Sequence, residues 1–525
     1  MTRKRLLMTL MLILGTIPIA TRADVRLPNI ISSGMVLQRG VKAPVWGKAA
    51  AGEQVTVTFA GQTKHATAGK DGRWQVHLEP LEATNEGREL RIKGNNEIRL
   101  SDVVVGEVWL ASGQSNMEFN IGQVAPEAKK IAFAAKDNKL LRMFCVAERI
   151  ASPTKCFFRG DRSAGEWSQA GEFLPKAEKG EIPPYYSHSA IGFFFGLRLA
   201  QELQIPIGVI DSSWGGTTIN CWIPDEEMKE AGIRFSPATE AQKKRMSAYQ
   251  KRIVDSVEAW LKAAKDGVQH GEYVPFTAAD IRAPLRAVNG VYNGMIYPLV
   301  PYAFKGVIWY QGETGAGATK TYDKSLKGLI SGWRTVFKNP EMQFYVVMIA
   351  PWPGYKKRGA TVMPDLVWAK QMQVADEIKG CEVIAIHDTT DERNFASIHP
   401  PGKMPVGNKL AANALRHAYG KAVPAAGPKF KSATLDGEKV IITFSGIDKG
   451  LSARDNKALT WFELSSDNKT FVKAKAVIDG NTVIATADGI AAPKFVRMGW
   501  ANTATPNLQD KNGWPAFPFS AQEIR

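Results

Sequence analysis

Cysteine and histidine are scarce in this chain of 525 residues, which contains four cysteines and seven histidines. No two cysteines form a C-x-x-C pair, and no histidine cluster accompanies them, so the sequence argues against a zinc site. We predict neither a metal nor an organic cofactor. A glycine-rich stretch, residues 312–320, lacks the Gly-Lys-Ser/Thr ending of a phosphate-binding loop. The cysteines are Cys145, Cys156, Cys221 and Cys381.

Long basic runs are also missing, although the chain is basic overall. Lysine and arginine number 67 against 51 acidic residues, a formal net charge of +16. These basic residues are dispersed and do not alternate with aromatic residues, so we do not predict nucleic-acid binding. A charged, well-hydrated surface explains the excess.

Apolar runs long enough to span a membrane are absent, because the run at the N-terminus is too short to do so comfortably and no later run is longer. Arg3-Lys4-Arg5 precede an apolar run from Leu6 to Ala20, and small residues precede a cleavage site after Ala23. This pattern is typical of a secretory signal peptide, residues 1–23. We therefore expect a secreted or periplasmic protein without membrane insertion after signal removal. Export would permit a Cys145–Cys156 disulfide.

The mature chain divides by pattern into three parts. Residues 24–104 show short alternating strands with Gly-containing turns, which predicts a β-sandwich-like domain. Residues 105–424 alternate strands with helices, which predicts an α/β domain of three layers with a parallel sheet between helices, interrupted by a polar helical insertion at about 225–285. Residues 425–525 return to strands and predict a C-terminal β-rich domain.

Polar residues gather where the predicted parallel strands end. Ser115 follows a strand-like run and precedes a helix, a turn that exposes its hydroxyl. Gly216, Gln311 and Glu313 follow other strands of the same domain. Because functional loops lie at the carboxyl ends of parallel strands, we expect these residues to share one site.

Four segments occur in an order that resembles a known family. Together they resemble the sialate O-acetylesterase family, a branch of the SGNH/GDSL hydrolases, and the likeness continues into the C-terminal tail. The segments are Gly113–Met117 (GQSNM), Ser212–Thr217 (SSWGGT), Trp309–Glu313 (WYQGE) and Ile398–Lys403 (IHPPGK).

The resemblance implies that Ser115 is the nucleophile and His399 the base. His399 lies in a proline-stiffened loop, and an imidazole titrates near neutrality, which suits proton transfer. Many SGNH hydrolases carry Asp two residues before this histidine, but here that position is Ser397. The group that orients His399 is left open between Asp391, which we favour, Asp388, Glu313 and a backbone carbonyl.

The oxyanion hole is expected to use the backbone N–H groups of Ser115 and Gly216, with the side-chain amide of Gln311 as third donor. Four further residues fall in family-like segments and are predicted to bind or shape the substrate site. They are Asn116, Glu313, Asn293 and Gln371.

The resemblance implies a serine-dependent carbohydrate O-acetylesterase. Its partner would be an acetylated glycan or sialoglycan, with sialic acid as the sugar that the family name suggests. Acetylated plant-wall polysaccharide, xylan or pectin, is the main alternative. A non-catalytic glycan-binding protein and a lipase or thioesterase are weaker alternatives. The sequence does not indicate an oligomeric state.

Overall fold

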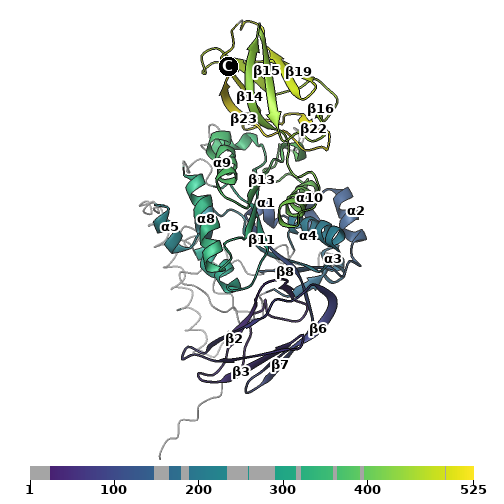
Figure 1. The fold of residues 1–525 in the computed structure, drawn as a ribbon, viewed down its shortest axis with the longest axis vertical. Coiled ribbons are helices and arrows are strands. Elements are labelled where there is room, and N and C mark those ends of the chain that lie inside the picture. The colour runs from purple at the N-terminus through teal and green to yellow at the C-terminus, as the bar shows by residue number, and fades with distance from the viewer. Residues whose placement is uncertain are drawn as a thin grey trace, which may run out of the picture.

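The computed structural model describes residues 24–146, 165–178, 188–232, 258, 290–314, 321–358, 363–390, 395–490 and 492–525. Within these ranges the chain is elongated, with strands at both ends and a sheet flanked by helices between them (Figure 1). The α/β fold class predicted from the sequence is confirmed. Most of the helical insertion predicted at about 225–285 lies outside the described residues, as does the signal peptide.

Two of the N-terminal strands bury every second side chain. In β3 (Gln54–Phe59) and β5 (Arg73–Leu78) the alternate residues face the core, as the sequence pattern predicts. β3 pairs with β4 and β6, whereas β5 pairs with β2. The other strands of this part are β1 (Val36–Gln38), β2 (Ala43–Lys48), β4 (Gln62–Thr67) and β6 (Thr84–Lys93).

One long strand joins this part to the central sheet. β7 (Glu97–Gly113) is 17 residues long. Its first half pairs antiparallel with β6, and its second half pairs in parallel with β10 (Ile207–Ser213) and β11 (Gly306–Tyr310). β7 crosses the predicted domain boundary at residues 104–105 without a break. The site at its C-terminal end is therefore attached to a strand that is fixed in two sheets.

The central sheet has the order β13-β12-β11-β7-β10-β8-β9, and all neighbours are parallel except β8 and β9. The chain passes outward from β7 to β8, returns to β10, and then crosses β7 to β11. The order reverses beside β7, and such a switch point is where open α/β sheets bind ligands. The remaining strands are β8 (Leu141–Cys145), β9 (Trp167–Gln169), β12 (Gln343–Val347) and β13 (Cys381–Ile384).

Helices cover both faces of this sheet. α8 (Tyr322–Val336) and α9 (Ala369–Glu377) lie on one face, and α4 (Ala190–Leu203) and α10 (Lys403–Asn413) lie on the other (Figure 1). α8 buries Leu326, Leu329 and Trp333 on one side, the spacing of an amphipathic helix. Shorter helices are α1 (Ser115–Glu118), α2 (Pro126–Ala134), α3 (Ala170–Glu178) and α5 (Asp225–Glu230).

Single turns of 3₁₀ or π geometry link these elements. The 3₁₀ turns are Ile121–Gln123, Ile219–Trp222, Tyr297–Leu299, Pro353–Arg358 and His387–Thr389, and the π turns are Tyr292–Ile296, Pro364–Trp368 and Ala414–Ala418.

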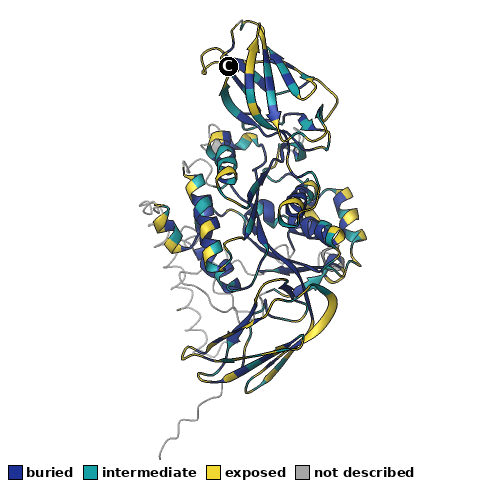
Figure 2. Cartoon of the chain, viewed as in Figure 1, coloured by how far each residue is buried: buried dark blue, intermediate teal, exposed yellow. Residues whose placement is uncertain are grey.

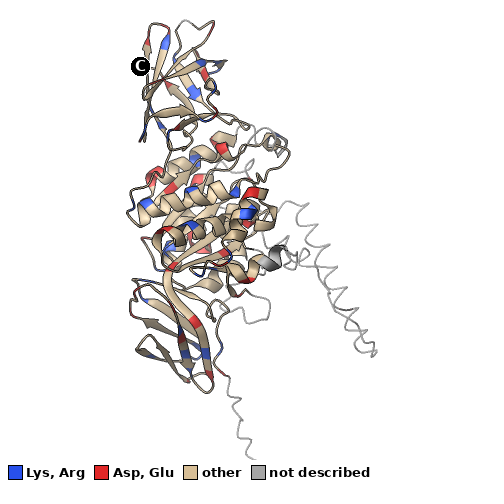
Figure 3. Ribbon diagram, turned by 90° about the vertical axis from the view of Figure 1, so that its right-hand side faces the viewer, with Lys and Arg blue, Asp and Glu red and all other residues tan. Residues whose placement is uncertain are grey.

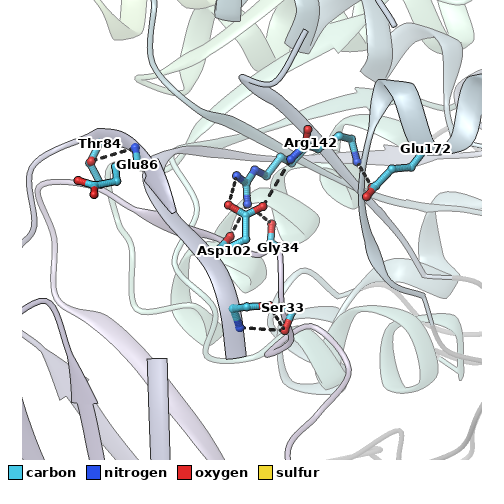
Figure 4. Close-up of polar contacts among 9 residues, drawn as sticks. Ser33, Gly34, Thr84, Glu86, Asp102, Arg142 and Glu172 are labelled. Atoms are coloured by element: carbon cyan, nitrogen blue, oxygen red, sulfur yellow. Dashed lines mark hydrogen bonds and ion pairs between the residues drawn. The ribbon is translucent and has the colours of Figure 1, made fainter. Parts of the chain in front are cut away.

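A buried arginine links the N-terminal strands to the central sheet. Arg142 of β8 donates to the carbonyl oxygen of Gly34 at 2.9 Å and to the carboxylate of Asp102 at 3.0 Å (Figure 4). Asp102 lies within β7 in a left-handed conformation, with φ of 55°, which a short polar side chain tolerates better than most. The Arg142 side chain is 4% exposed, so this ion pair is partly shielded from water.

The C-terminal strands form a separate apolar core. It includes Val440, Ile442, Phe462 and Val496 from facing strands. The strands are β14 (Lys429–Asp436), β15 (Lys439–Ser445), β16 (Leu451–Ala453), β17 (Phe462–Ser465), β18 (Val472–Lys473), β19 (Lys475–Asp479), β20 (Thr482–Thr486), β21 (Phe495–Met498), β22 (Leu508–Asp510) and β23 (Phe519–Glu523).

Burial follows this layered arrangement. The strands of the central sheet are buried, and the outward faces of the covering helices are exposed (Figure 2). Basic and acidic residues are interspersed over the ribbon (Figure 3). Among the helices in the described ranges, none is both long and apolar enough to cross a bilayer.

Candidate active site

Ser115 lies at a sharp turn between β7 and α1. Gly113 ends the strand with φ of 140°, and a Cβ there would lie 2.2 Å from the carbonyl oxygen of Tyr310. Only glycine fits this approach. The next residue, Gln114, donates its N–H to the same carbonyl at 3.0 Å and is the N-cap of α1. The turn is thus fixed against β11, and Ser115 becomes the first helical residue.

His399 approaches Ser115 from a loop 284 residues further along the chain. The Nε2 atom of His399 lies 2.7 Å from the hydroxyl oxygen of Ser115. This is hydrogen-bonding distance for a base that removes a hydroxyl proton. The backbone N–H of His399 donates to the Ser397 hydroxyl at 3.0 Å, which shapes the loop. The structure brings together the two residues that the sequence predicts as nucleophile and base.

Asp388, one candidate for orienting His399, is engaged elsewhere. Both of its carboxylate oxygens accept from the Lys409 ammonium, at 2.5 and 2.6 Å. Lys409 is 8% exposed, and burial lowers its pKa although the Asp388 charge opposes that shift. Releasing Asp388 would leave this buried cation unpaired, which is unfavourable. Asp391, the favoured candidate, lies outside the described residues, and its role stays a prediction.

The loop after β10 lies directly against the nucleophile. A Cβ on Gly215 would lie 3.1 Å from the Cβ of Ser115. The N–H of Gly215 donates to the carboxylate of Glu118 at 2.7 Å, a contact that the sequence analysis missed. Gly216 follows with φ of 72°. Within the described part of the chain no acceptor is recorded for the Gly216 N–H, which remains our predicted oxyanion donor.

The amide of Gln311 is held in a buried network. Its Nε2 donates to the Gln114 side-chain oxygen at 3.1 Å and to the Thr217 carbonyl at 3.2 Å, and its Oε1 accepts from Tyr322. Gln311 is fully buried. Both amide hydrogens therefore tie the loops together in this arrangement. The oxyanion role predicted for Gln311 stays a prediction that would require one of these bonds to be exchanged.

Three of the predicted substrate-binding residues are almost completely buried beside the site. Asn116 is 0% exposed, Glu313 is 1% exposed, and they bond to one another at 2.5 Å. Gln371, also 0% exposed, donates to the carbonyl of Val347 at 3.1 Å and to that of Gln311 at 3.4 Å. Their side chains face protein groups, so the geometry favours a supporting role over direct contact with a sugar.

Two other residues complete the surroundings. Asn293 lies in the π turn and is 2% exposed. Lys403, which ends the IHPPGK segment, is 1% exposed and donates to the side-chain oxygen of Asn116 at 2.5 Å. The sequence analysis assigned Lys403 no role beyond its place in that segment. In the described ranges, no group of three or more His, Cys, Asp or Glu residues could hold a metal ion.

The chain is similar to known carbohydrate esterases. A family profile described as "Carbohydrate esterase, sialic acid-specific acetylesterase" matches residues 287–416. The rat sialate O-acetylesterase is 27% identical over 560 residues, covering 98% of this chain and 97% of the relative. The human sialate O-acetylesterase is 27% identical over 423 residues, covering 75% of this chain and 71% of the relative.

A solved structure covers almost the same length. The crystal structure of a carbohydrate acetylesterase from Xanthomonas citri superimposes with a TM-score of 0.75 at 28% identity, covering 94% of this chain and 99% of that one. The match to the rat relative and that to the structural neighbour thus extend over the strands at both ends as well as the central sheet. The chain is thus similar over almost its whole length to a sialate O-acetylesterase and to a carbohydrate acetylesterase, and residues 287–416 match the sialic acid-specific acetylesterase model.

Proposed function

We propose that this protein hydrolyses O-acetyl esters on sugars, with Ser115 as nucleophile and His399 as general base. The distance of 2.7 Å between His399 Nε2 and the Ser115 hydroxyl is the observation that carries the proposal. The pair lies at the switch point of a parallel sheet, where ligands of such folds bind. Both relatives named above are sialate O-acetylesterases, so O-acetylated sialic acid is the substrate that we propose first.

The geometry supports a two-step reaction. Ser115 attacks the acetyl carbonyl carbon while His399 accepts the hydroxyl proton, and the negative charge on the carbonyl oxygen is stabilised by the N–H groups of Ser115 and Gly216. Collapse of this intermediate breaks the bond to the sugar oxygen, which takes the proton from His399. Water, deprotonated by His399, then attacks the acetyl-serine and releases acetate.

The test is acetate release by purified, folded variants. Ser115→Ala and His399→Ala are each expected to lower turnover by on the order of 10³-fold or more, and the double variant is expected to be little worse, because the residues act as a unit. Ser331→Ala and His417→Ala, on α8 and on the π turn after α10, are matched controls that should retain turnover. Parental activity of Ser115→Ala would exclude the proposed function.

The sugar is identified by a substrate panel. Acetate release from O-acetylated sialic acids, acetylated xylan and acetylated pectin is compared with release from a small acetyl ester and from a long-chain ester. Preference for sialic acids supports the proposed substrate, and preference for a plant polysaccharide supports the alternative. A preference for the long-chain ester would indicate a lipase.

We also propose that the protein is exported, secreted or periplasmic, and not inserted in the membrane after signal removal. The basic, apolar and small-residue regions of residues 1–23 support this proposal. N-terminal sequencing of the protein made in its own cells should begin near Asp24. Retention of Met1 would contradict export.

A further inference from the structure

Three buried polar side chains connect the helix that carries Ser115 to the loop that carries His399. They are Asn116, Glu313 and Lys403. Asn116 immediately follows Ser115, and its Nδ2 donates to the carbonyl oxygen of Ile398 at 3.1 Å, one residue before His399. The same Nδ2 donates to Glu313 at 2.5 Å, and Lys403 donates to the Asn116 Oδ1 at 2.5 Å. One amide therefore contacts the nucleophile helix, the histidine loop, the end of β11 and the start of α10.

The partners of Asn116 leave its amide a single orientation. In its ammonium form Lys403 can only donate, so the atom facing it is the amide oxygen. A carboxylate and a backbone carbonyl can only accept, so the atom facing Glu313 and Ile398 must be the amide nitrogen. Rotating the amide by 180° would place donor against donor and acceptor against acceptor. The distance between the nucleophile helix and the histidine loop is thus set by a fully specified group.

The position of Lys403 is unfavourable for stability alone. Lys403 is 1% exposed, and burial lowers its pKa to about 7, although the charge of Glu313 opposes the shift. It is also the first residue of α10, where the helix dipole disfavours a positive charge. Its ammonium lies 4.8 Å from the ring centre of Phe119 and 5.4 Å from that of Tyr310, which compensates part of the lost hydration. Violations of local rules of this kind are expected at functional sites.

We propose that Lys403 is a positioning residue for the reaction, acting through Asn116 to hold Ser115 and His399 at reacting distance. Glu313 completes the arrangement by accepting from the opposite end of the same amide. Lys403 touches neither the substrate nor the reacting atoms. The inference rests on the proposed function, because it concerns the alignment of that pair.

The experiment compares Lys403→Met with Lys409→Met. Both remove a buried lysine head from α10, but Lys409 bonds to Asp388 and to the carbonyl oxygen of Ala385, away from Asn116. Lys403→Met is expected to lower kcat on a small acetyl ester by roughly 10- to 100-fold, the effect of a small misplacement of reacting groups, with little change in KM. Lys409→Met is expected to lower the thermal midpoint but to retain kcat per folded molecule.

A second readout reports alignment without the substrate. The rate at which a small organophosphonate inactivates the enzyme depends on the Ser115–His399 pair, and it is expected to fall in parallel with kcat in Lys403→Met only. Parental kcat and inactivation rate in Lys403→Met would overturn the inference. Ser115→Ala, assayed alongside, separates the two failures: if it stays active, the proposed function fails, and if it is inactive, only the role of Lys403 fails.

The double variant Lys403→Met/Glu313→Gln distinguishes loss of the Lys403–Asn116 bond from the effect of leaving the Glu313 charge without a nearby cation. It also provides a test if the single variant Lys403→Met does not fold. It removes both buried charges and leaves Asn116 without its ammonium donor. We expect a thermal midpoint closer to that of the parent than Lys403→Met shows, with kcat still reduced. Recovery of the parental kcat would mean that the single variant suffers only from an unpaired Glu313, and the positioning role would be excluded.

Discussion

Ser397 occupies the position where many SGNH hydrolases carry an aspartate, two residues before the catalytic histidine. Its hydroxyl accepts a hydrogen bond from the backbone N–H of His399. Ser397 therefore shapes the loop and does not provide the carboxylate that orients the imidazole. Asp388 is committed to Lys409, and Glu313 to Asn116. Of the carboxylates considered from the sequence, this leaves Asp391 as our proposed partner of His399, with a backbone carbonyl as the alternative.

Replacement of the two aspartates tests this assignment. Asp391→Asn is expected to lower kcat by on the order of 10²-fold or more, because a mis-oriented imidazole is a poor base. Asp388→Asn is expected to lower the thermal midpoint, since it leaves Lys409 without its anion, while kcat changes little. Steady-state kinetics and thermal unfolding of both variants provide the comparison. Near-parental kcat in both would favour a Ser-His pair oriented by a backbone carbonyl.

At the residue level, the family resemblance selected Ser115 and His399, and their places in a strand-to-helix turn and a proline-stiffened loop supported the choice. The structure places their side chains 2.7 Å apart, and their catalytic roles stay predictions. Lys403 could not be selected, because its burial depends on Asn116, 287 positions earlier in the chain. Gln371 and Asn116 were expected near a substrate, and the structure instead encloses them with other amides and carbonyls.

At the scale of elements, the ends of a helix or strand can be predicted when residues of the segment itself determine where it begins and ends. Helix α4 is bounded at Ala190 and Leu203, because Ser189 caps its start by accepting the N–H of Gly192 and Gln204 ends it in a left-handed conformation. β7 could not be predicted to span two sheets, because its residues are equally suited to either. The pairing partners of a strand are set by tertiary contacts that no local pattern encodes.

A buried histidine between β9, α3 and α4 predicts acid sensitivity. His188 is 6% exposed, its Nε2 lies 3.1 Å from the Ser168 hydroxyl, and its ring centre is 4.4 Å from that of Phe173. Burial lowers its pKa to about 4 from 6.5. Between pH 6.5 and about pH 4 the unfolded chain therefore binds a proton at this histidine, whereas the folded protein does not. The stabilisation is present above pH 6.5 and is lost as pH falls toward 4.

His188→Gln removes this proton uptake and keeps a group that can bond to Ser168. The loss in free energy of unfolding between pH 7 and pH 4 is expected to shrink by up to about 3 kcal/mol, at about 1.36 kcal/mol per pKa unit. Urea titrations at both pH values measure the change. His65→Gln, on the exposed strand β4, is the matched control for loss of an imidazole. An identical pH dependence in His188→Gln and the parent would contradict the argument.

At the scale of the molecule, the C-terminal strands touch the loops that follow β12. The carbonyl oxygen of Asn502 accepts the N–H of Trp352 at 2.7 Å, and its side-chain oxygen accepts the N–H of Met363 at 2.6 Å. Trp500 donates its indole N–H to Asp365 at 2.7 Å. Because β12 is parallel to β11 and β7, this loop leaves the same edge of the sheet as Ser115. We therefore expect the C-terminal part to support the rim of the candidate site.

Asn502→Ala tests whether that support matters for binding a large substrate. The change removes the bond to Met363 and leaves the backbone contact with Trp352, so the loop should loosen without unfolding. A lost hydrogen bond of about 1 kcal/mol corresponds to roughly a fivefold rise in KM for an acetylated oligosaccharide, which must order the loop as it binds. A small acetyl ester does not need the rim, and its kcat and KM should stay parental.

Asn512→Ala, which removes bonds to Asp448 and Asp510 within the C-terminal strands, is the matched control and should affect neither substrate. Equal changes in KM for both substrates, or none for either, would mean that the C-terminal part contributes stability alone.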